Sequence, residues 1–356
     1  LSTCIFYFLA TFVFTRPVLS LMVIGNSQAD LILDEGQKYM YLMGFIGIQM
    51  MISSILSSSY REIGRVRVIL VITLIAAGSN AFLNWVFIYG HLGMPRLEVE
   101  GAAYATIIAK TVEMLLLIGY TIKERPEFIS FSVFKRIDWA LFGRILKKGS
   151  LLIISQMMWV LSESFTAAIY NGRGNAAVVS GMAASFSIAN LFFISFDGIT
   201  TATGVLIGKS LGRNELEDAR KEKTWMLSAA IIFGCIMCLV GVVTVLLVPV
   251  VFGNLSIDAQ NICRAILLLM ALFMPLWICV NTQVAVCRAG GDTKVGFLVD
   301  GGTTAVMIPM LLILAFFTNA SPVMMYFGVK ALDVGKIIVA THEMKKERWV
   351  VNLSNG

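Results

Sequence analysis

Long apolar runs recur along the sequence, and they limit the fold more than any other feature. About ten stretches are long and apolar enough to cross the roughly 30 Å hydrocarbon core of a bilayer. We predict spans near residues 1–22, 38–58, 66–90, 101–122, 150–171, 180–208, 224–252, 265–287, 295–317 and 322–341. Hydrophobic residues make up 58% of the chain and charged residues only 14%, which excludes an ordinary soluble domain. Because a helix satisfies its own backbone in lipid, the predicted fold is an all-α, polytopic membrane bundle.

Basic residues gather in every second loop between the predicted spans. These loops contain Arg61, Arg65 and Arg67, residues 123–148, residues 209–223, Arg288 and Lys294, and residues 345–348. The alternate loops, such as GNSQADLILDEGQ and TNAS, are acidic or nearly uncharged. Because positive charge marks cytoplasmic loops, we predict a multi-pass protein of the bacterial cytoplasmic (inner) membrane with a cytoplasmic C-terminus. The net charge of +6 therefore indicates topology and not a nucleic-acid partner.

One long linker divides the sequence into two halves. Residues 123–149 carry apolar residues at helical spacing against basic ones, which is typical of an amphipathic helix on an anionic membrane surface. An ordinary solvated loop is the alternative. We expect residues 1–122 to form an incomplete N-terminal bundle of four spans. Residues 150–356 are expected to form a C-terminal bundle of six spans with a cytoplasmic tail.

Matching elements recur in the same order in the two halves. Arg61 and Gly64 in SSSYREIGRV match Arg288 and Gly291 in VCRAGGDTKV, and AKTVEM matches VKALDV. Such a duplication favours two repeats related by an axis near the membrane normal, with any substrate cavity between them. The sequence also begins inside an apolar run. We therefore expect two spans to be absent from the front, and a complete chain of twelve spans in two pseudo-symmetric six-helix bundles.

Several segments resemble, in order and spacing, the multidrug and toxic compound extrusion (MATE) family. They are NAFLNWVFIYGHLGMPRLEVEGAAYAT, GKSLGRNELEDAR, NTQVAVCRAGGDTK and KKERWVVNL. The resemblance covers essentially the whole chain. It implies a V-shaped pair of six-helix bundles that exports organic cations or other amphipathic compounds by antiport with Na⁺ or H⁺. It implies no enzymatic activity, and no cofactor apart from the coupling ion.

Asn80 and Asn84 place two amides on one face of the third predicted span, because they are four residues apart. A buried amide without a partner costs about 1–3 kcal/mol, so each should face protein, water or an ion. The family resemblance implies that both residues and Thr106 bind the coupling cation, together with an acidic residue on a first span that we expect to be absent here. The alternative is that the two amides tie neighbouring helices together by hydrogen bonds.

Ionisable residues inside spans are further candidates, because a charge at mid-bilayer costs about 2.5–3.5 kcal/mol on insertion scales. The resemblance implies a role in cation or substrate binding for Glu163, whose carboxylate could also exchange protons if burial raises its pKa. Asp197, Asn281 and Asp300 are the other substrate or proton candidates. A helix contact is the alternative for Glu163, and an ion pair near the cytoplasmic end is the alternative for Asp300.

Two Lys-x-x-acid pairs are spaced so that each can neutralise itself within one helix. They are Lys110 with Glu113 and Lys330 with Asp333. Pairs three residues apart on a helix are neighbours, which favours a structural role for both.

Three classes of function fit these observations. The favoured prediction is a monomeric, ion-coupled exporter that lies in the lipid bilayer and binds a small-molecule substrate. A flippase for lipid-linked sugars would need several inward basic groups to meet a diphosphate, and only Arg16, Lys110, Lys330 and Lys336 lie within predicted spans. A membrane scaffold that transports nothing would not need buried Glu163 or Asp197.

Overall fold

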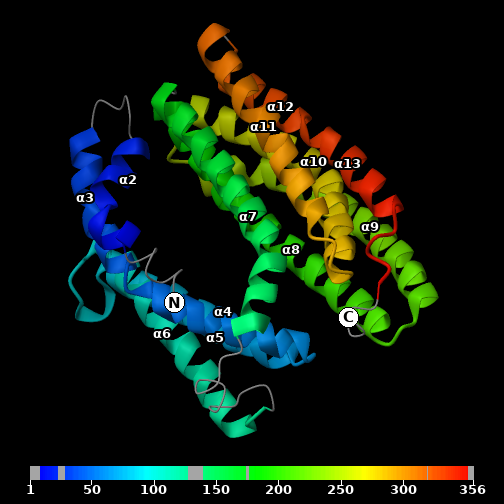
Figure 1. Cartoon of the computed structure of the whole chain (residues 1–356). Helices are drawn as coiled ribbons and strands as arrows, with labels where there is room; N and C mark the ends of the chain where they lie inside the picture. Colours follow the sequence, from blue (N-terminus) through cyan, green and yellow to red (C-terminus); the bar gives the residue numbers. More distant parts are fainter. Residues whose placement is uncertain (1–8, 23–28, 127–138, 174–175, 319, 352–356) are drawn as a thin grey trace. The chain divides into compact units, whose positions relative to one another are not determined.

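The structure is a computed structural model of the chain, shown in Figure 1. It describes residues 9–22, 29–126, 139–173, 176–318 and 320–351. The described residues form helices and turns, with no strand among them. The chain divides into two compact units, residues 1–137 and residues 138–356.

The first unit contains two long helices that pack closely along each other, α5 and α6. Its elements are η1 (Leu9–Val13), α2 (Thr15–Met22), α3 (Ala29–Met43), α4 (Ile46–Glu62), α5 (Val66–Tyr89), η2 (His91–Gly93) and α6 (Glu98–Glu124). Helix α5 ends where Gly90 adopts a left-handed conformation with φ of 73°, which glycine reaches without a steric penalty. The lack of a side chain at Gly101 lets the two helices approach, because a Cβ there would lie 2.7 Å from the carbonyl oxygen of Phe87.

The second unit is built around α10, whose residues are buried along most of its length. Its elements are α7 (Trp139–Arg173), α8 (Ala176–Gly212), α9 (Leu216–Val251), α10 (Ile257–Ala289), α11 (Lys294–Phe317), α12 (Pro322–Ala331) and α13 (Asp333–Lys345). Helices α8, α9 and α13 all pack against α10. With 37 residues, α8 is about 55 Å long and exceeds the hydrocarbon core of a bilayer.

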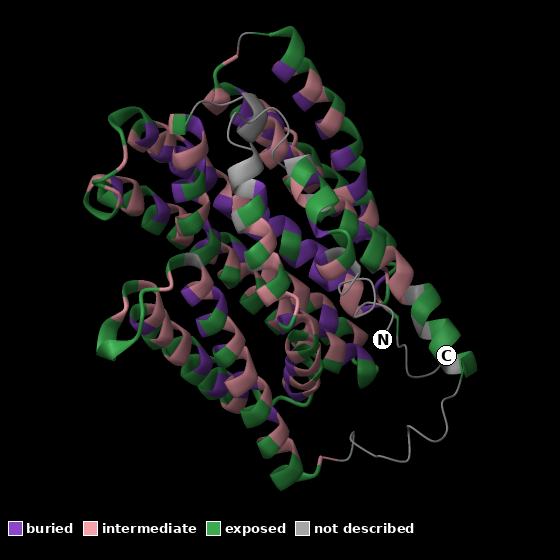
Figure 2. Ribbon diagram, turned by 90° about the vertical axis from the view of Figure 1, so that its left-hand side faces the viewer, coloured by how far each residue is buried: buried purple, intermediate pink, exposed green. Residues whose placement is uncertain are grey.

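Buried and exposed positions alternate along the helices, as Figure 2 shows. The exposed positions are often strongly apolar: Phe317 is 84% exposed and Val250 is 80% exposed. Large apolar side chains face outward at this density when the surrounding solvent is lipid.

Seven described helices are long and apolar enough to cross a membrane, or up to eight if the bent pair formed by α3 and α4 counts as one span. This confirms the predicted all-helical membrane bundle. The stretch near 322–341, predicted as one span, is divided into α12 and α13. Tight hydrogen bonds mark the division, from the Leu332 N–H to the Val329 oxygen (3.3 Å) and from the Gly335 N–H to the Leu332 oxygen (2.9 Å).

Two predicted segments fall partly outside the described residues. Of the first predicted span, residues 1–22, the structure describes residues 9–22, which contain η1 and α2. The amphipathic helix predicted in residues 123–149 includes residues 127–138, which also lie outside the description; α6 ends before them and α7 begins after them.

The segment after α13 folds back onto the ends of α9 and α10. Trp349 is 1% exposed and its indole N–H donates to the Met344 oxygen at 3.2 Å. Arg220 of α9 forms an ion pair with Glu347 at 2.8 Å. A Cβ at Gly290, which follows α10, would lie 1.7 Å from the Trp349 oxygen. The basic ends of α9, α10 and the C-terminal segment are thus joined at one end of the second unit.

Candidate functional site

A cluster of two carboxylates and two ammonium groups lies inside the second unit. Lys330 of α12 donates to Glu163 of α7 at 3.0 Å, and Lys336 of α13 pairs with Asp333 at 3.1 Å. The side chains of Lys330 and Asp333 are 14% and 7% exposed. Charges this deep are tolerated when each one has a partner of opposite sign and hydrogen bonds. The cluster satisfies that condition with no net charge.

Trp277 of α10 connects the two ion pairs. Its indole N–H donates to Asp333 Oδ2 at 2.8 Å, and its ring centroid lies 5.6 Å from Lys330 Nζ. Tyr326 of α12 presents a second ring to the same ammonium, also at 5.6 Å. Both distances fall within the roughly 6 Å range of cation–π attraction. Lys330 therefore lies in a small cage made of one carboxylate and two aromatic rings.

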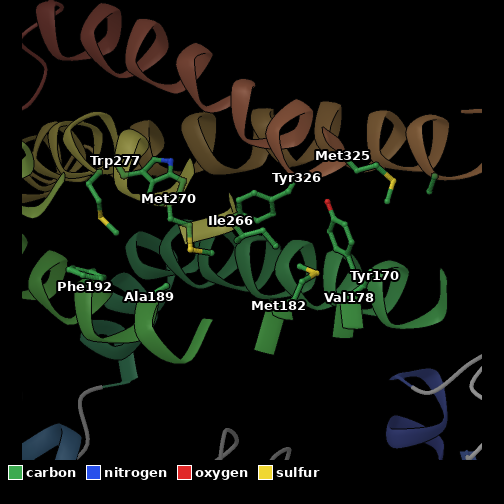
Figure 3. Close-up of a cluster of buried hydrophobic side chains, with 12 residues drawn as sticks. Tyr170, Val178, Met182, Ala189, Phe192, Ile266, Met270, Trp277, Met325 and Tyr326 are labelled. Carbon is green, nitrogen blue, oxygen red and sulfur yellow. The ribbon is translucent and has the colours of Figure 1, made fainter. Parts of the chain in front are cut away.

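The cage borders the largest hydrophobic cluster of the second unit. Trp277, Tyr326 and Tyr170 all belong to that cluster, which Figure 3 shows in close-up. The hydroxyl of Tyr170 points toward the side on which Met325 and Tyr326 lie (Figure 3). Among the described residues this buried hydroxyl has no hydrogen-bond partner. A buried polar group without a hydrogen-bond partner lowers stability by about 1–3 kcal/mol, so we expect the Tyr170 hydroxyl to have a partner.

The interpretation of the second Lys-x-x-acid pair was wrong. Lys330 pairs with Glu163 instead of Asp333, and Asp333 pairs with Lys336. The helix break at Leu332 separates the two residues into α12 and α13, so the geometry of one continuous helix does not apply. In contrast, Lys110 and Glu113 form the expected pair at 2.8 Å within α6.

The other candidates of the second unit lie around the cage or apart from it. Asn281 is one helical turn beyond Trp277 and donates to its backbone oxygen at 2.9 Å. Asp300 of α11 accepts a hydrogen bond of 2.8 Å from Ser155 of α7. Asp197 is exposed on α8. No hydrogen bond or ion pair among the described residues joins Asp197 or Asp300 to Glu163 or Lys330.

Asn80, Asn84 and Thr106 form a chain of hydrogen bonds between α5 and α6 in the first unit. The Asn84 amide donates to Asn80 Oδ1 at 3.0 Å, and the Asn80 amide donates to Thr106 Oγ1 at 3.4 Å. The Thr106 hydroxyl donates to the Ala102 oxygen at 2.8 Å. The Asn80 amide therefore joins α5 to α6, whereas the Asn84 amide bonds within α5.

One acceptor oxygen of this group has no hydrogen-bond partner among the described residues. Asn84 Oδ1 is buried and accepts no hydrogen bond within the described part of the chain. An unused amide oxygen is a suitable ligand for a hard cation. No group of three or more His, Cys, Asp or Glu side chains placed to hold a metal ion occurs among the described residues. The assignment of Asn80, Asn84 and Thr106 to a cation stays a prediction.

The aromatic half of the cage and the pairing of Lys336 with Asp333 were not predicted from the sequence. Trp277 and Tyr326 are aromatic residues in apolar runs that also contain Phe273 and Phe327, so nothing local distinguishes them from core residues. Trp277 does precede Asn281 by four residues, so a polar residue on the same helical face was an available signal.

Comparisons with known proteins agree with this architecture. The family model named MatE matches residues 1–86 and 152–324. The probable multidrug resistance protein NorM of Mesorhizobium japonicum is 27% identical over 299 residues, covering 81% of this chain and 63% of that protein. A protein of the same name from Neisseria meningitidis serogroup B is 28% identical over 250 residues, covering 68% of this chain and 53% of that protein. The chain thus spans less than two thirds of the length of these relatives.

A solved structure has a fold similar to that of this chain. A MOP superfamily transporter from Pyrococcus furiosus superimposes with a TM-score of 0.78 at 17% identity. The match covers 97% of this chain and 76% of that one.

Proposed function

This chain belongs to the MatE family, and we propose that it exports cationic or amphipathic small molecules by antiport with Na⁺ or H⁺. Its relatives are called probable multidrug resistance proteins, which supports an organic substrate. The chain works as a monomer in the bacterial inner membrane. Its basic loops and C-terminal segment lie on the cytoplasmic side, in keeping with the distribution of positive charge.

The observation that carries the proposal is the buried contact between Glu163 and Lys330 beside two aromatic rings. A carboxylate with aromatic faces has the chemistry that recognises an organic cation: the carboxylate supplies charge, and the rings supply cation–π attraction and apolar contact. Paired ionisable residues inside a membrane bundle mark substrate or proton pathways. Glu163 is the member of the cluster through which substrate gains access, because 30% of its side chain is exposed.

Asn80, Asn84 and Thr106 supply the coupling-ion site in this proposal. The buried, unused Asn84 Oδ1 supports it, since Na⁺ accepts hard neutral oxygens. Neutral oxygens alone bind weakly. A carboxylate 4 Å away adds about 4 kcal/mol of attraction at an effective dielectric of 20, so a nearby acid decides the affinity.

The alternative function, a flippase for lipid-linked sugars, receives less support. A diphosphate needs free cationic groups, whereas Lys330 and Lys336 are each already paired with a carboxylate.

Transport by the protein in proteoliposomes tests the proposal. We expect outward movement of a fluorescent organic cation when a Na⁺ gradient or a proton gradient is imposed alone, and no movement without either. Transport of the cation at the same rate with and without the two gradients would contradict ion-coupled antiport. No movement of any organic cation under either gradient would contradict the assignment as an exporter.

A further inference from the structure

The ammonium of Lys330 has the surroundings that a bound organic cation would need. It has a carboxylate at 3.0 Å and two ring centroids at 5.6 Å each. Aromatic cages with an acidic partner are a common way to bind quaternary ammonium ligands. In this chain a side chain of the protein fills the place of such a ligand.

Packing holds the two rings of the cage, whereas its carboxylate is less buried. Tyr326 is 1% exposed and Trp277 is 9% exposed, so packing fixes both rings. The indole of Trp277 is also fixed by its hydrogen bond to Asp333. Glu163, whose side chain is 30% exposed, is the least buried of the three.

Lys330 has another partner within reach if it leaves the cage. Asp333 follows it by three residues, and the helix break at Leu332 lies between them. A lysine side chain is long and has several rotatable bonds, so its charge can move between two carboxylates while the backbone stays in place. Asp333 would then face both Lys330 and Lys336.

We propose that Lys330 is a tethered competitor for organic cations: its ammonium fills the cage of Glu163, Trp277 and Tyr326 in the empty protein, and a compact quaternary ammonium ion displaces it. The inference rests on the proposed function in one respect only, namely that organic cations are the substrate class. It adds that the ammonium of Lys330 neutralises the carboxylate of Glu163 in the empty site. It also adds that competition from Lys330 sets the affinity of the protein for organic cations.

Binding of tetramethylammonium to the purified protein in detergent, measured by calorimetry, tests this inference. Lys330→Met keeps the length of the side chain and removes the charge, so we expect affinity to rise by at least about tenfold. Lys110→Met is the matched control, because Lys110 also pairs with an acid three residues away but has no aromatic partner among the described residues. That control should bind like the wild type. Adding Glu163→Gln to Lys330→Met should abolish the gain.

A second measurement on the wild-type protein covers the case in which Lys330→Met does not fold. Acetylation of lysines, read by peptide mass spectrometry, should become faster at Lys330 when tetramethylammonium is added. Lys110 is the internal control, since it pairs with Glu113 within α6 and shares no partner with Lys330. We expect its acetylation to stay unchanged.

Three results would overturn the inference. They are an unchanged affinity in folded Lys330→Met, a gain that survives Glu163→Gln, and equal acetylation of Lys330 with and without tetramethylammonium. None of these measurements requires transport. A protein that shows the expected binding and does not transport would refute the proposed function alone, while unchanged binding in an active transporter would refute this inference alone.

Discussion

Lys330 forms its ion pair with Glu163, which lies 167 residues earlier in the chain, and not with Asp333, three residues later. The contact joins α7 to α12, the helices that lie near the two ends of the second unit in sequence. Because the pair connects such distant segments, breaking it should weaken the packing of α7 against α12.

Removing one member of this pair should destabilise the second unit. We expect Glu163→Gln to lower the free energy of unfolding by about 3 kcal/mol, the low end for breaking a buried pair, because part of Glu163 is exposed. The double variant Glu163→Gln with Lys330→Met should recover most of the loss, since no buried charge remains unpaired. Denaturant or thermal unfolding in detergent measures both. If the double variant were less stable than Glu163→Gln, the pair would not be the source of the effect.

The docking of the C-terminal segment should depend on Gly290. Gly290→Ala places a methyl group where the Trp349 oxygen now lies, and the contacting atom is backbone, so the segment must move. We expect faster proteolysis after α13 and greater exposure of Trp349 to a fluorescence quencher. Gly208→Ala is the control, because a Cβ there meets no atom within 4 Å and alanine favours the helix by about 1 kcal/mol. Equal proteolysis in the two variants would show that the segment is not held at Gly290.

The same segment should loosen at low pH. The hydrogen bond and charge of Arg220 hold the pKa of Glu347 below its usual range. A lowered pKa in the folded state means that the contact stabilises docking above the ordinary glutamate pKa of about 4.3, and that this contribution is lost as the pH falls through the lower, folded value. Proteolysis of the C-terminal segment at decreasing pH should show this release. Glu347→Gln should be loose at every pH, and an unchanged pH profile in that variant would assign the release to another group.

The hydrogen bonds between α5 and α6 lead to a prediction for ion coupling. Asn84→Ala removes the unused Oδ1, whereas Asn80→Ala removes the central member of the hydrogen-bond chain. Both should raise the Na⁺ concentration needed for half-maximal transport more than they raise the half-maximal substrate concentration. Thr111→Val, which removes a hydrogen bond between Gln49 and α6 in the same unit, is the control. Equal effects on Na⁺ and on substrate would place the asparagines in a structural role only.

The sequence predicted the structural features that depend on residues close together along one helix. The apolar run near 66–90 corresponds to α5 at Val66–Tyr89, because the pattern reports burial in lipid and Gly90 ends the helix. Asn80 and Asn84 were expected on one face, and their side chains do bond to each other. The contact between Lys110 and Glu113 follows from the same helical spacing.

Contacts between distant segments could not be predicted in this way. The partner of Lys330 depends on how α7 packs against α12. The spacing of Lys330 and Asp333 gave the wrong partner because the helix breaks between them, at Leu332, which is neither proline nor glycine. Trp277 and Tyr326 became part of a site only through the fold, since each is an ordinary aromatic residue in its own helix.

The central claim is that Glu163 carries charge for the transported cation. The most direct measurement is export of an organic cation from proteoliposomes at acidic, neutral and mildly alkaline pH, with equal amounts of folded wild type, Glu163→Gln and the double variant with Lys330→Met. The account predicts strongly reduced transport in both variants at every pH, although the double variant is stable. Transport by the stable double variant at the wild-type rate would contradict it.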